Sequence, residues 1–369
     1  MTLMANVVRT RSHLCSAIEG ELTGLISTRS NSARAYGPEF SRLWDIAGEN
    51  ILGGKFVRPL LLVETYDAFD EHARDRNTAI SIAAAIELLH YAFLLHDDVI
   101  DGDLVRRGRP NLVGALLAEA GQLPPMDQRP DAGRPDSALH WAQTGGILMG
   151  DMLLAATHQA FARVDLPHPL RIRLLDLLEH TINETVAGEQ LDVGLGDGII
   201  APELETILTM CGYKTATYTF ELPLRAAATL AGVEPSVESA LATAGRHLGL
   251  AFQLQDDFLS TFGDPRRHGK DPFSDLREGK QTTIIAYARK TSAWADIEPW
   301  FGRPDLCTED GEKVRSQLSE CGAETFVQGH IDQQTRAFHD VLADTDNPLP
   351  DKVRNVLMDL AAQLEGRQS

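Results

Sequence analysis

Apolar residues recur with helical spacing along most of this 369-residue chain. Positions three and four apart share one face of a helix, so this spacing predicts helices that bury one side. The clearest periodic stretches are residues 79–95, 146–162, 170–186 and 241–259. No stretch alternates apolar and polar residues convincingly, as a half-buried strand would. We therefore expect an all-α fold, a single large helical bundle, in one domain that spans residues 1–369.

Two features refine the expected boundaries. Residues 121–137 are rich in Gly, Pro, Asp and Arg and interrupt the periodic pattern, so we expect an insertion loop there. Ser236 precedes a long periodic stretch and is the residue type that caps helix N-termini. We expect the corresponding helix to begin after it.

An acidic cluster ends the first of these helices. The apolar run gives way to Asp97, Asp98 and Asp101, and Arg106-Arg107 follows shortly after. Asp97 and Asp101 are four apart and share a face, with Asp98 beside them. Clustered carboxylates at the end of a buried helix repel one another unless a cation compensates them. Hard oxygen ligands without Cys or paired His favour Mg²⁺, which shares its coordination with waters and substrate phosphates.

A second acidic pair, Asp256-Asp257, ends another apolar helix far downstream. One cluster alone could be a solvated helix end, but two carboxylate-tipped helices predict one shared site. There several Mg²⁺ ions would hold a diphosphate and neutralise it as a leaving group.

Basic residues occur in four further places, as directional cations for a diphosphate would require. Any one of them alone would be read as a solvated surface charge. They are Lys55 and Arg58 after Gly53-Gly54, Arg106-Arg107, Lys214 followed by Thr215, and Lys270 followed by Lys280.

Taken together, these motifs resemble the trans-type isoprenyl diphosphate synthases, from residue 53 to about residue 283. Asp97, Asp98 and Asp101 match the family's Asp-Asp-x-x-Asp motif, and Arg106-Arg107-Gly108 matches the Arg-Arg-Gly that follows it. The resemblance implies an all-α bundle around a central cavity, a homodimer, and Mg²⁺ as cofactor, with three ions per active site. The second motif departs from the pattern, because Ser260 stands where many members carry a third aspartate.

The resemblance also implies roles for individual residues. The metal ligands would be Asp97, Asp98, Asp101, Asp256 and Asp257. The allylic diphosphate would be held by Arg106, Lys214 and Lys270, and the metal-free diphosphate of isopentenyl diphosphate by Lys55, Arg58, His90 and Arg107. Gln253 and Thr215 would line the pocket, and a loop from Lys270 to Lys280 would close it. Lys280 would also bind substrate. The catalytic set would be Asp97, Asp101, Arg106, Lys214, Asp256 and Lys270.

The implied reaction condenses isopentenyl diphosphate with dimethylallyl, geranyl or farnesyl diphosphate. None of the implied groups is a plausible nucleophile, so catalysis would be electrostatic, through an allylic carbocation that later loses a proton. Water must be excluded while the cation exists.

Product length is expected to depend on Phe93, one helical turn before Asp97. A turn rises about 5.4 Å, comparable to one isoprene unit, so its ring should obstruct a long tail. In the family, aromatic rings at both this and the preceding position go with the C15 product. With Ala92 as the neighbour, we expect all-trans geranylgeranyl diphosphate (C20), with farnesyl diphosphate as the alternative.

Composition limits the partners and the compartment. The formal net charge of −19 disfavours nucleic acid and anionic membrane surfaces. We expect no apolar run of transmembrane length and no signal-peptide core, and therefore a cytoplasmic protein without stable membrane insertion. The four cysteines lack ligand-like spacing and are expected to be reduced.

Other classes of protein compete for the same residues. A metal phosphohydrolase would leave the second aspartate pair unexplained, and a di-iron bundle needs two Glu-x-x-His helices, of which only residues 87–90 offer one. A non-catalytic regulatory subunit of a heteromeric prenyl synthase would also keep the fold, although such subunits tend to lose aspartates that are present here.

Overall fold

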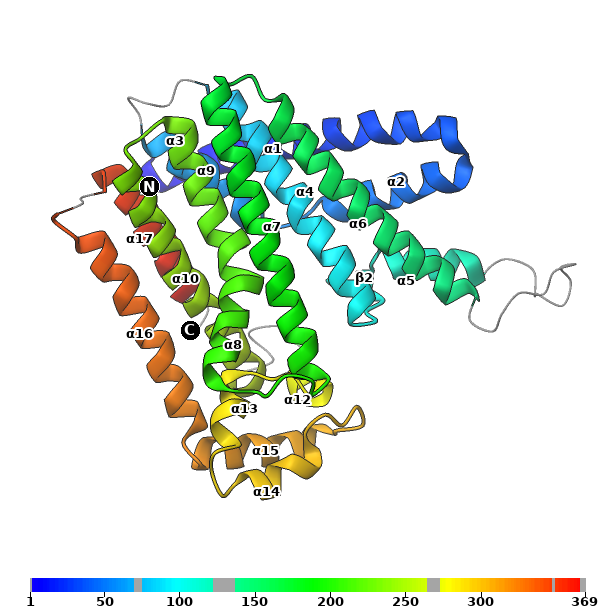
Figure 1. Ribbon diagram of the computed structural model, residues 1–369, viewed down its shortest axis with the longest axis vertical. Coiled ribbons are helices and arrows are strands. Elements are labelled where there is room, and N and C mark those ends of the chain that lie inside the picture. Colours follow the sequence, from blue (N-terminus) through cyan, green and yellow to red (C-terminus); the bar gives the residue numbers. More distant parts are fainter. Residues whose placement is uncertain (1, 70–74, 122–136, 264–272, 347–348, 366–369) are drawn as a thin grey trace, which may run out of the picture. The chain divides into compact units, whose positions relative to one another are not determined.

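The computed structural model describes residues 2–69, 75–121, 137–263, 273–346 and 349–365 (Figure 1). Within these ranges the elements are helical except for the two-residue strands β1 and β2, so the all-α prediction is confirmed. The chain divides into two compact units. Residues 1–63 and 75–175 form unit 1, and residues 64–74 and 176–369 form unit 2. That both units act as a single domain stays a prediction.

Unit 1 is a layer of long helices with a small hairpin. α4 packs against α6 and α1, and α1 lies beside α2 (Figure 1). The elements are α1 (Thr2–Ala33), η1 (Arg34–Tyr36), α2 (Pro38–Ile51), the start of α3 (Val57–Ala68), α4 (Arg76–Ile100), β1 (Val105–Arg106), β2 (Arg109–Pro110), α5 (Leu112–Gly121), α6 (Ser137–Arg163) and the start of α7 (His168–Gly196).

α4 is the central helix of unit 1. Asp75 caps its N-terminus by accepting from the backbone N–H groups of Asn77 and Thr78. The helix is buried on most sides and is long and apolar enough to span a membrane by length and composition alone. The expectation that no apolar run reaches that length is therefore wrong for α4. Because 72% of its most apolar stretch is buried, α4 has the character of a core helix in a globular unit.

Glycines of α6 allow the acidic end of α4 to pack closely. A Cβ atom at Gly146 would lie 2.7 Å from Val99 Cγ2, and one at Gly150 would lie 2.3 Å from His96 Nε2. Both contacts are with side-chain atoms, so a larger residue at either position would force Val99 or His96 to move. Glycine therefore leaves room for these two side chains at the end of the helix that carries Asp97 and Asp98.

Unit 2 is built around α10, which packs against α16, η4 and α9. α10 begins at Pro235 with Glu234 as its N-cap, so the prediction of Ser236 as the cap is wrong; proline suits the first helical position because it lacks an N–H. The elements are the end of α3, most of α7, α8 (Leu204–Cys211), η4 (Gly212–Glu221), α9 (Leu222–Ala231), α10 (Pro235–Phe262), α12 (Ser274–Glu278), α13 (Thr283–Ala288), α14 (Trp294–Ile297), η5 (Glu298–Trp300), α15 (Thr308–Glu320), α16 (Ala323–Ala343) and α17 (Asp351–Glu365).

η4 is a ten-residue π-helix. π-helical turns are rare in proteins, and those that occur are often found at functional sites. A Cβ at Gly188 of α7 would lie 2.3 Å from the backbone nitrogen of Lys214, and one at Gly249 of α10 would lie 2.5 Å from Ala216 Cβ. Glycine on both neighbouring helices therefore lets them approach the widened backbone of η4.

Candidate active site

The first acidic cluster lies at the C-terminal end of α4 in unit 1. The side chain of Asp97 is 22% exposed, whereas that of Asp98 is 1% exposed. Asp101 is exposed and caps the helix by donating its backbone N–H to Asp97 O at 2.8 Å. The accessible carboxylates of this cluster are thus those of Asp97 and Asp101, one turn apart.

Arg106 is bound to this cluster. Its Nε and Nη2 donate to Asp98 Oδ1 at 2.8 and 2.6 Å, and Nη2 also donates to Asp97 Oδ2 at 3.2 Å. Burial raises the pKa of Asp98, and the hydrogen bonds from Arg106 act against that rise. Arg106, predicted to hold the allylic diphosphate, therefore lies at the predicted metal motif and also anchors its buried aspartate.

A hairpin that the sequence pattern did not predict presents the two arginines. Val105 pairs with Pro110, and Arg106 pairs with Arg109. The two residues between the strands, Arg107 and Gly108, have φ of +55° and +72°. A two-residue hairpin turn with positive φ at both positions fits the twist of the strands, but it is costly for an arginine. The turn places Arg107 at the wall of a cavity.

This cavity, of about 340 Å³, lies within unit 1 between the end of α2, α4 and the hairpin. Its lining includes Glu87, His90, Tyr91, Asp98, Arg106 and Arg107. Burial lowers the pKa of His90 well below its usual 6.5, and the nearby Arg58, Arg107 and Arg106 lower it further. His90 therefore faces the cavity as a neutral imidazole.

The remaining residues predicted to bind isopentenyl diphosphate lie around the start of α3. Arg58 stands in the first turn of that helix, near enough to His90 to lower its pKa, and Lys55 is exposed on the preceding loop. The structure thus brings His90, Arg58 and Arg107 together within unit 1.

Two buried polar residues of the cavity wall were not among the predicted site residues, although Glu87 was noted as part of a Glu-x-x-His pattern. Within the described residues, Glu87 Oε2 and the Tyr91 hydroxyl are buried and have no hydrogen-bond partner. Burial raises the pKa of Tyr91 strongly, and Asp98 adds to the effect. Glu87 precedes His90 by three residues, so a search for polar groups on the same helical face would have found it.

Phe93, the predicted chain-length residue, lies one turn before Asp97 on α4 and is partly buried. Ala92 is fully buried, with 0% exposure. That these two residues set the product length stays a prediction.

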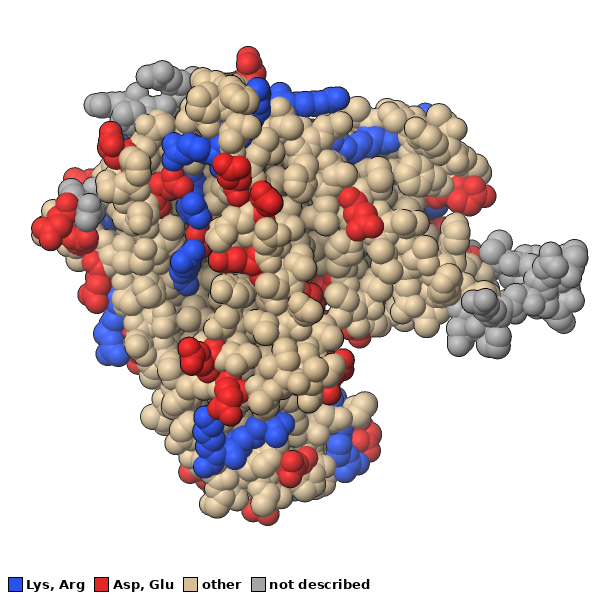
Figure 2. All heavy atoms as spheres, viewed as in Figure 1, with Lys and Arg blue, Asp and Glu red and all other residues tan. Residues whose placement is uncertain are grey.

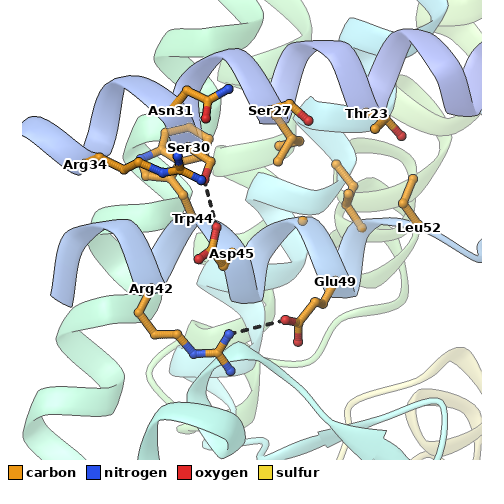
Figure 3. Close-up of a pocket in the computed structure, with 13 residues that line it drawn as sticks. Thr23, Ser27, Ser30, Asn31, Arg34, Arg42, Trp44, Asp45, Glu49 and Leu52 are labelled. Carbon is orange, nitrogen blue, oxygen red and sulfur yellow. Dashed lines mark hydrogen bonds and ion pairs between the residues drawn. The ribbon is translucent and has the colours of Figure 1, made fainter. Parts of the chain in front are cut away.

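A second hollow of unit 1, of about 570 Å³, lies between α1 and α2 (Figure 3). Ser30 donates to Asp45 there at 2.7 Å, and Arg42 pairs with Glu49 at 3.2 Å. None of the predicted site residues lines it, so we do not assign the active site to this groove.

The second acidic pair belongs to α10 in unit 2. Asp256 is partly exposed, whereas Asp257 is 3% exposed. Thr215 Oγ1 donates to Gln253 Oε1 at 2.8 Å, and Gln253 Nε2 donates to Asp257 Oδ1 at 2.8 Å. This chain of hydrogen bonds links η4 to the acidic pair and joins two residues that were predicted only to line a pocket.

Burial raises the pKa of Asp257 to about 7; Lys280 acts against the rise, and Asp275 adds to it. Lys280 is therefore an electrostatic partner of the buried aspartate. Ser260, where a third aspartate was expected, is 6% exposed, and its hydroxyl has no hydrogen-bond partner in the described part of the chain.

Lys214 is held by two carboxylates of α7. Its Nζ lies 2.9 Å from Glu189 Oε2 and 2.7 Å from Asp192 Oδ2. Both acids were missed, although their spacing of three residues puts them on one helical face. An arriving diphosphate would have to share Lys214 with them. Lys270 and residues 122–136 of the predicted insertion lie outside the described residues.

These side chains fit magnesium as a cofactor completed by substrate. No group of three or more His, Cys, Asp or Glu side chains among the described residues could hold a metal ion alone. Mg²⁺ keeps several waters and binds through one or two carboxylates plus substrate phosphates. The partly or fully exposed side chains of Asp97, Asp101 and Asp256 suit that mode, although Arg106 also donates a 3.2 Å hydrogen bond to Asp97. Asp98 and Asp257 are buried and are engaged by Arg106 and Gln253.

The charged surface is mixed. On the face shown in Figure 2, Lys and Arg lie in small groups among Asp and Glu, and no basic stripe extends across it.

Known proteins resemble this chain over most of its length. Residues 41–318 match the family model of polyprenyl synthetase. A geranylgeranyl diphosphate synthase of Methanosarcina mazei is 30% identical over 279 residues, 75% of each chain. A (2E,6E)-farnesyl diphosphate synthase of Mycobacterium bovis is 30% identical over 329 residues, 86% of this chain and 80% of that one.

Among solved structures, a geranylgeranyl pyrophosphate synthase from Corynebacterium glutamicum, complexed with isoprenyl diphosphate and magnesium, superposes with a TM-score of 0.83. The two sequences are 29% identical, and the match covers 96% of this chain and 98% of that one. The chain therefore belongs to the polyprenyl synthetase family, as a short-chain trans-prenyltransferase.

Proposed function

We propose that this enzyme condenses isopentenyl diphosphate with allylic diphosphates to give all-trans geranylgeranyl diphosphate. The observation that carries the proposal is the pairing, in unit 1, of accessible Asp97 and Asp101 with a cavity lined by His90 and Arg107. The relatives from Methanosarcina and Corynebacterium are geranylgeranyl synthases, which supports the C20 product. The farnesyl synthase of Mycobacterium supports C15 as the second candidate.

Asp97, Asp101 and Asp256 would hold Mg²⁺, three ions in all, with Asp98 and Asp257 in support. When bound, the metal would neutralise the charge that develops on the departing diphosphate. We propose that both acidic pairs act in this one reaction. Arg106, Lys214 and Lys270 would bind the allylic diphosphate, while Lys55, Arg58, His90 and Arg107 would bind that of isopentenyl diphosphate.

The chain's own groups explain the selectivity for a diphosphate. Guanidinium groups bind phosphate oxygens in bidentate geometry, and neutral His90 can donate one N–H without adding repulsion to the arginines. The apolar body of α4 keeps water from a tail that lies along it, which protects a carbocation from hydrolysis.

The proposal is tested by incubating the purified protein with Mg²⁺, isopentenyl diphosphate and each allylic primer in turn. The products are then dephosphorylated and separated by chromatography. C20 alcohol is expected from all three primers, and chelation of the metal should stop turnover. C15 alone would favour the farnesyl alternative. Absence of turnover would favour the non-catalytic subunit.

We also propose a homodimer that uses an apolar row on α6. Trp141, Leu148 and Met152 are spaced to share one face and are 52%, 51% and 39% exposed. Exposed apolar rows of this kind mark interfaces, and a self-complementary helix face suits a two-fold dimer. Light scattering should give twice the monomer mass for the natural protein and the monomer mass for Leu148→Asp. His158→Asp, an exposed change on the same helix, is the control. A monomeric natural protein would contradict the proposal.

A further inference from the structure

Glu87 presents an unusual electrostatic situation in unit 1. Glu87 is 5% exposed, and its Oε2 has no hydrogen-bond partner within the described residues. A buried carboxylate without compensation is strongly destabilising, so such groups are normally paired. The compensation must therefore come from charges close by.

Those charges belong to Arg58 and Arg107. Burial raises the pKa of Glu87, and Arg58 and Arg107 both act against the rise. The two guanidinium groups also lower the pKa of His90, one turn further along α4. Both arginines are thus close to the same stretch of α4 as Glu87.

The side chains of Glu87 and Arg107 both approach the backbone at Gly54. A Cβ atom at Gly54 would lie 3.5 Å from Glu87 Oε1 and 3.5 Å from both Nη1 and Nη2 of Arg107. The carboxylate and the guanidinium therefore converge on one backbone position. Both side chains also line the 340 Å³ cavity.

Arg107 lines the cavity, and Arg58 acts on Glu87 from close by. Two guanidinium groups near one carboxylate repel each other when no anion is present. We propose that Glu87 is a positioning residue that holds Arg107 and Arg58 in place for the diphosphate of isopentenyl diphosphate. Glu87 itself does not touch the substrate. It lowers the repulsion between the arginines and so keeps the cavity ready for the anion. This inference rests on the proposed function of the cavity.

The test is equilibrium binding of isopentenyl diphosphate alone, without Mg²⁺ and without an allylic primer, measured by titration calorimetry. Glu87→Gln keeps the shape and removes the charge, and we expect its Kd to rise about tenfold relative to the natural protein. Glu87→Asp keeps the charge and should lose less. Glu21→Gln is the matched control, since Glu21 accepts a hydrogen bond from Ser81 of α4 at 2.8 Å but does not line the cavity.

A double-mutant cycle separates positioning from general damage to the fold. If Glu87 acts through Arg107, then Glu87→Gln should weaken binding much less in an Arg107→Gln background than in the natural protein. Steady-state kinetics should show a higher KM for isopentenyl diphosphate, with the KM for the allylic primer little changed.

An unchanged or lower Kd in Glu87→Gln would overturn the inference, as would full additivity with Arg107→Gln. Failure of the natural protein to bind isopentenyl diphosphate would instead refute the proposed function of the cavity. The two failures are therefore distinguishable.

Discussion

Arg106 joins a buried carboxylate to an accessible one, because its Nη2 lies 2.6 Å from Asp98 Oδ1 and 3.2 Å from Asp97 Oδ2. The second acidic pair shows the same division, with Asp257 buried and bonded to Gln253 while Asp256 remains partly exposed. In each unit, the first aspartate is the more exposed of the pair, and the second is buried and hydrogen-bonded to its surroundings.

This division predicts different outcomes for neighbouring substitutions. Asp97→Asn should raise the Mg²⁺ concentration for half-maximal activity at least tenfold, because an accessible metal ligand is lost. Its melting temperature should change little, since the side chain is only partly buried. A metal titration of activity and a thermal melt check both statements, and an unchanged Mg²⁺ requirement would contradict the ligand assignment.

Asp98→Asn should act mainly on stability. The substitution breaks the ion pair between buried Asp98 and Arg106, whose side chain is 31% exposed, and weakens the main hydrogen bonds of Arg106. Loss of a charge-assisted hydrogen bond of this kind costs about 2 kcal/mol. Urea denaturation of the metal-free protein measures the loss, with Asp97→Asn as the matched control. Equal stability of the two variants would refute the division of roles.

The lowered pKa of His90 predicts that folding stability depends on pH. Its pKa is lowered in the folded state, so between that value and 6.5 the unfolded chain binds a proton that the folded chain does not. Folding stability should therefore fall as pH drops below 6.5, by up to about 1.4 kcal/mol per pH unit from this group. Denaturation of the natural protein and of His90→Gln between pH 7 and 5 should show a shallower decline in the variant. Parallel curves would contradict the prediction.

Phe93→Ala should lengthen the product. Removing the ring one turn before Asp97 leaves room for a further isoprene unit along α4. Chromatography of the dephosphorylated products should shift from C20 toward C25 and longer. Ala92→Phe, at a fully buried position, should instead destabilise the fold by overpacking. An unchanged product distribution in Phe93→Ala would show that the side chain is ordinary packing.

Ser260→Asp tests the incomplete second motif. Ser260 is buried one turn after Asp256, so a carboxylate there would be desolvated close to another acid. The melting temperature should fall in chelator, by several degrees, and recover when Mg²⁺ is added together with inorganic diphosphate. Ser260→Asn controls for size. A loss that the ions do not restore would place this position outside the metal site.

Apolar periodicity was sufficient to predict the helical fold, and the spacing of acidic and basic residues was sufficient to identify the charged motifs. Asp97 and Asp101 are separated by one helical turn and follow a continuous apolar run, so local spacing determines their arrangement. Local spacing also places Gln253 and Asp257 one turn apart on α10, where they share a hydrogen bond. The bond from Thr215 to Gln253 depends instead on the packing of η4 against α10 and could not be predicted from spacing.

Other features depend on contacts between distant segments. The widened turns of η4 have no period of their own in the sequence, and the two-residue hairpin at Arg106 is too short for an alternating pattern. Glu189 and Asp192 look like ordinary charges on a helical face until Lys214 is placed against them. Such pairings follow from tertiary structure rather than from any local motif.

The close approach of Gly188 to the backbone of Lys214 limits how this enzyme can diversify. Any side chain at Gly188 would collide with main-chain atoms rather than with a movable group, so the position offers no gradual route to a new substrate range. If Phe93 sets product length as predicted, adaptation toward longer or shorter products has freer scope there, because the change would be one of side-chain volume alone.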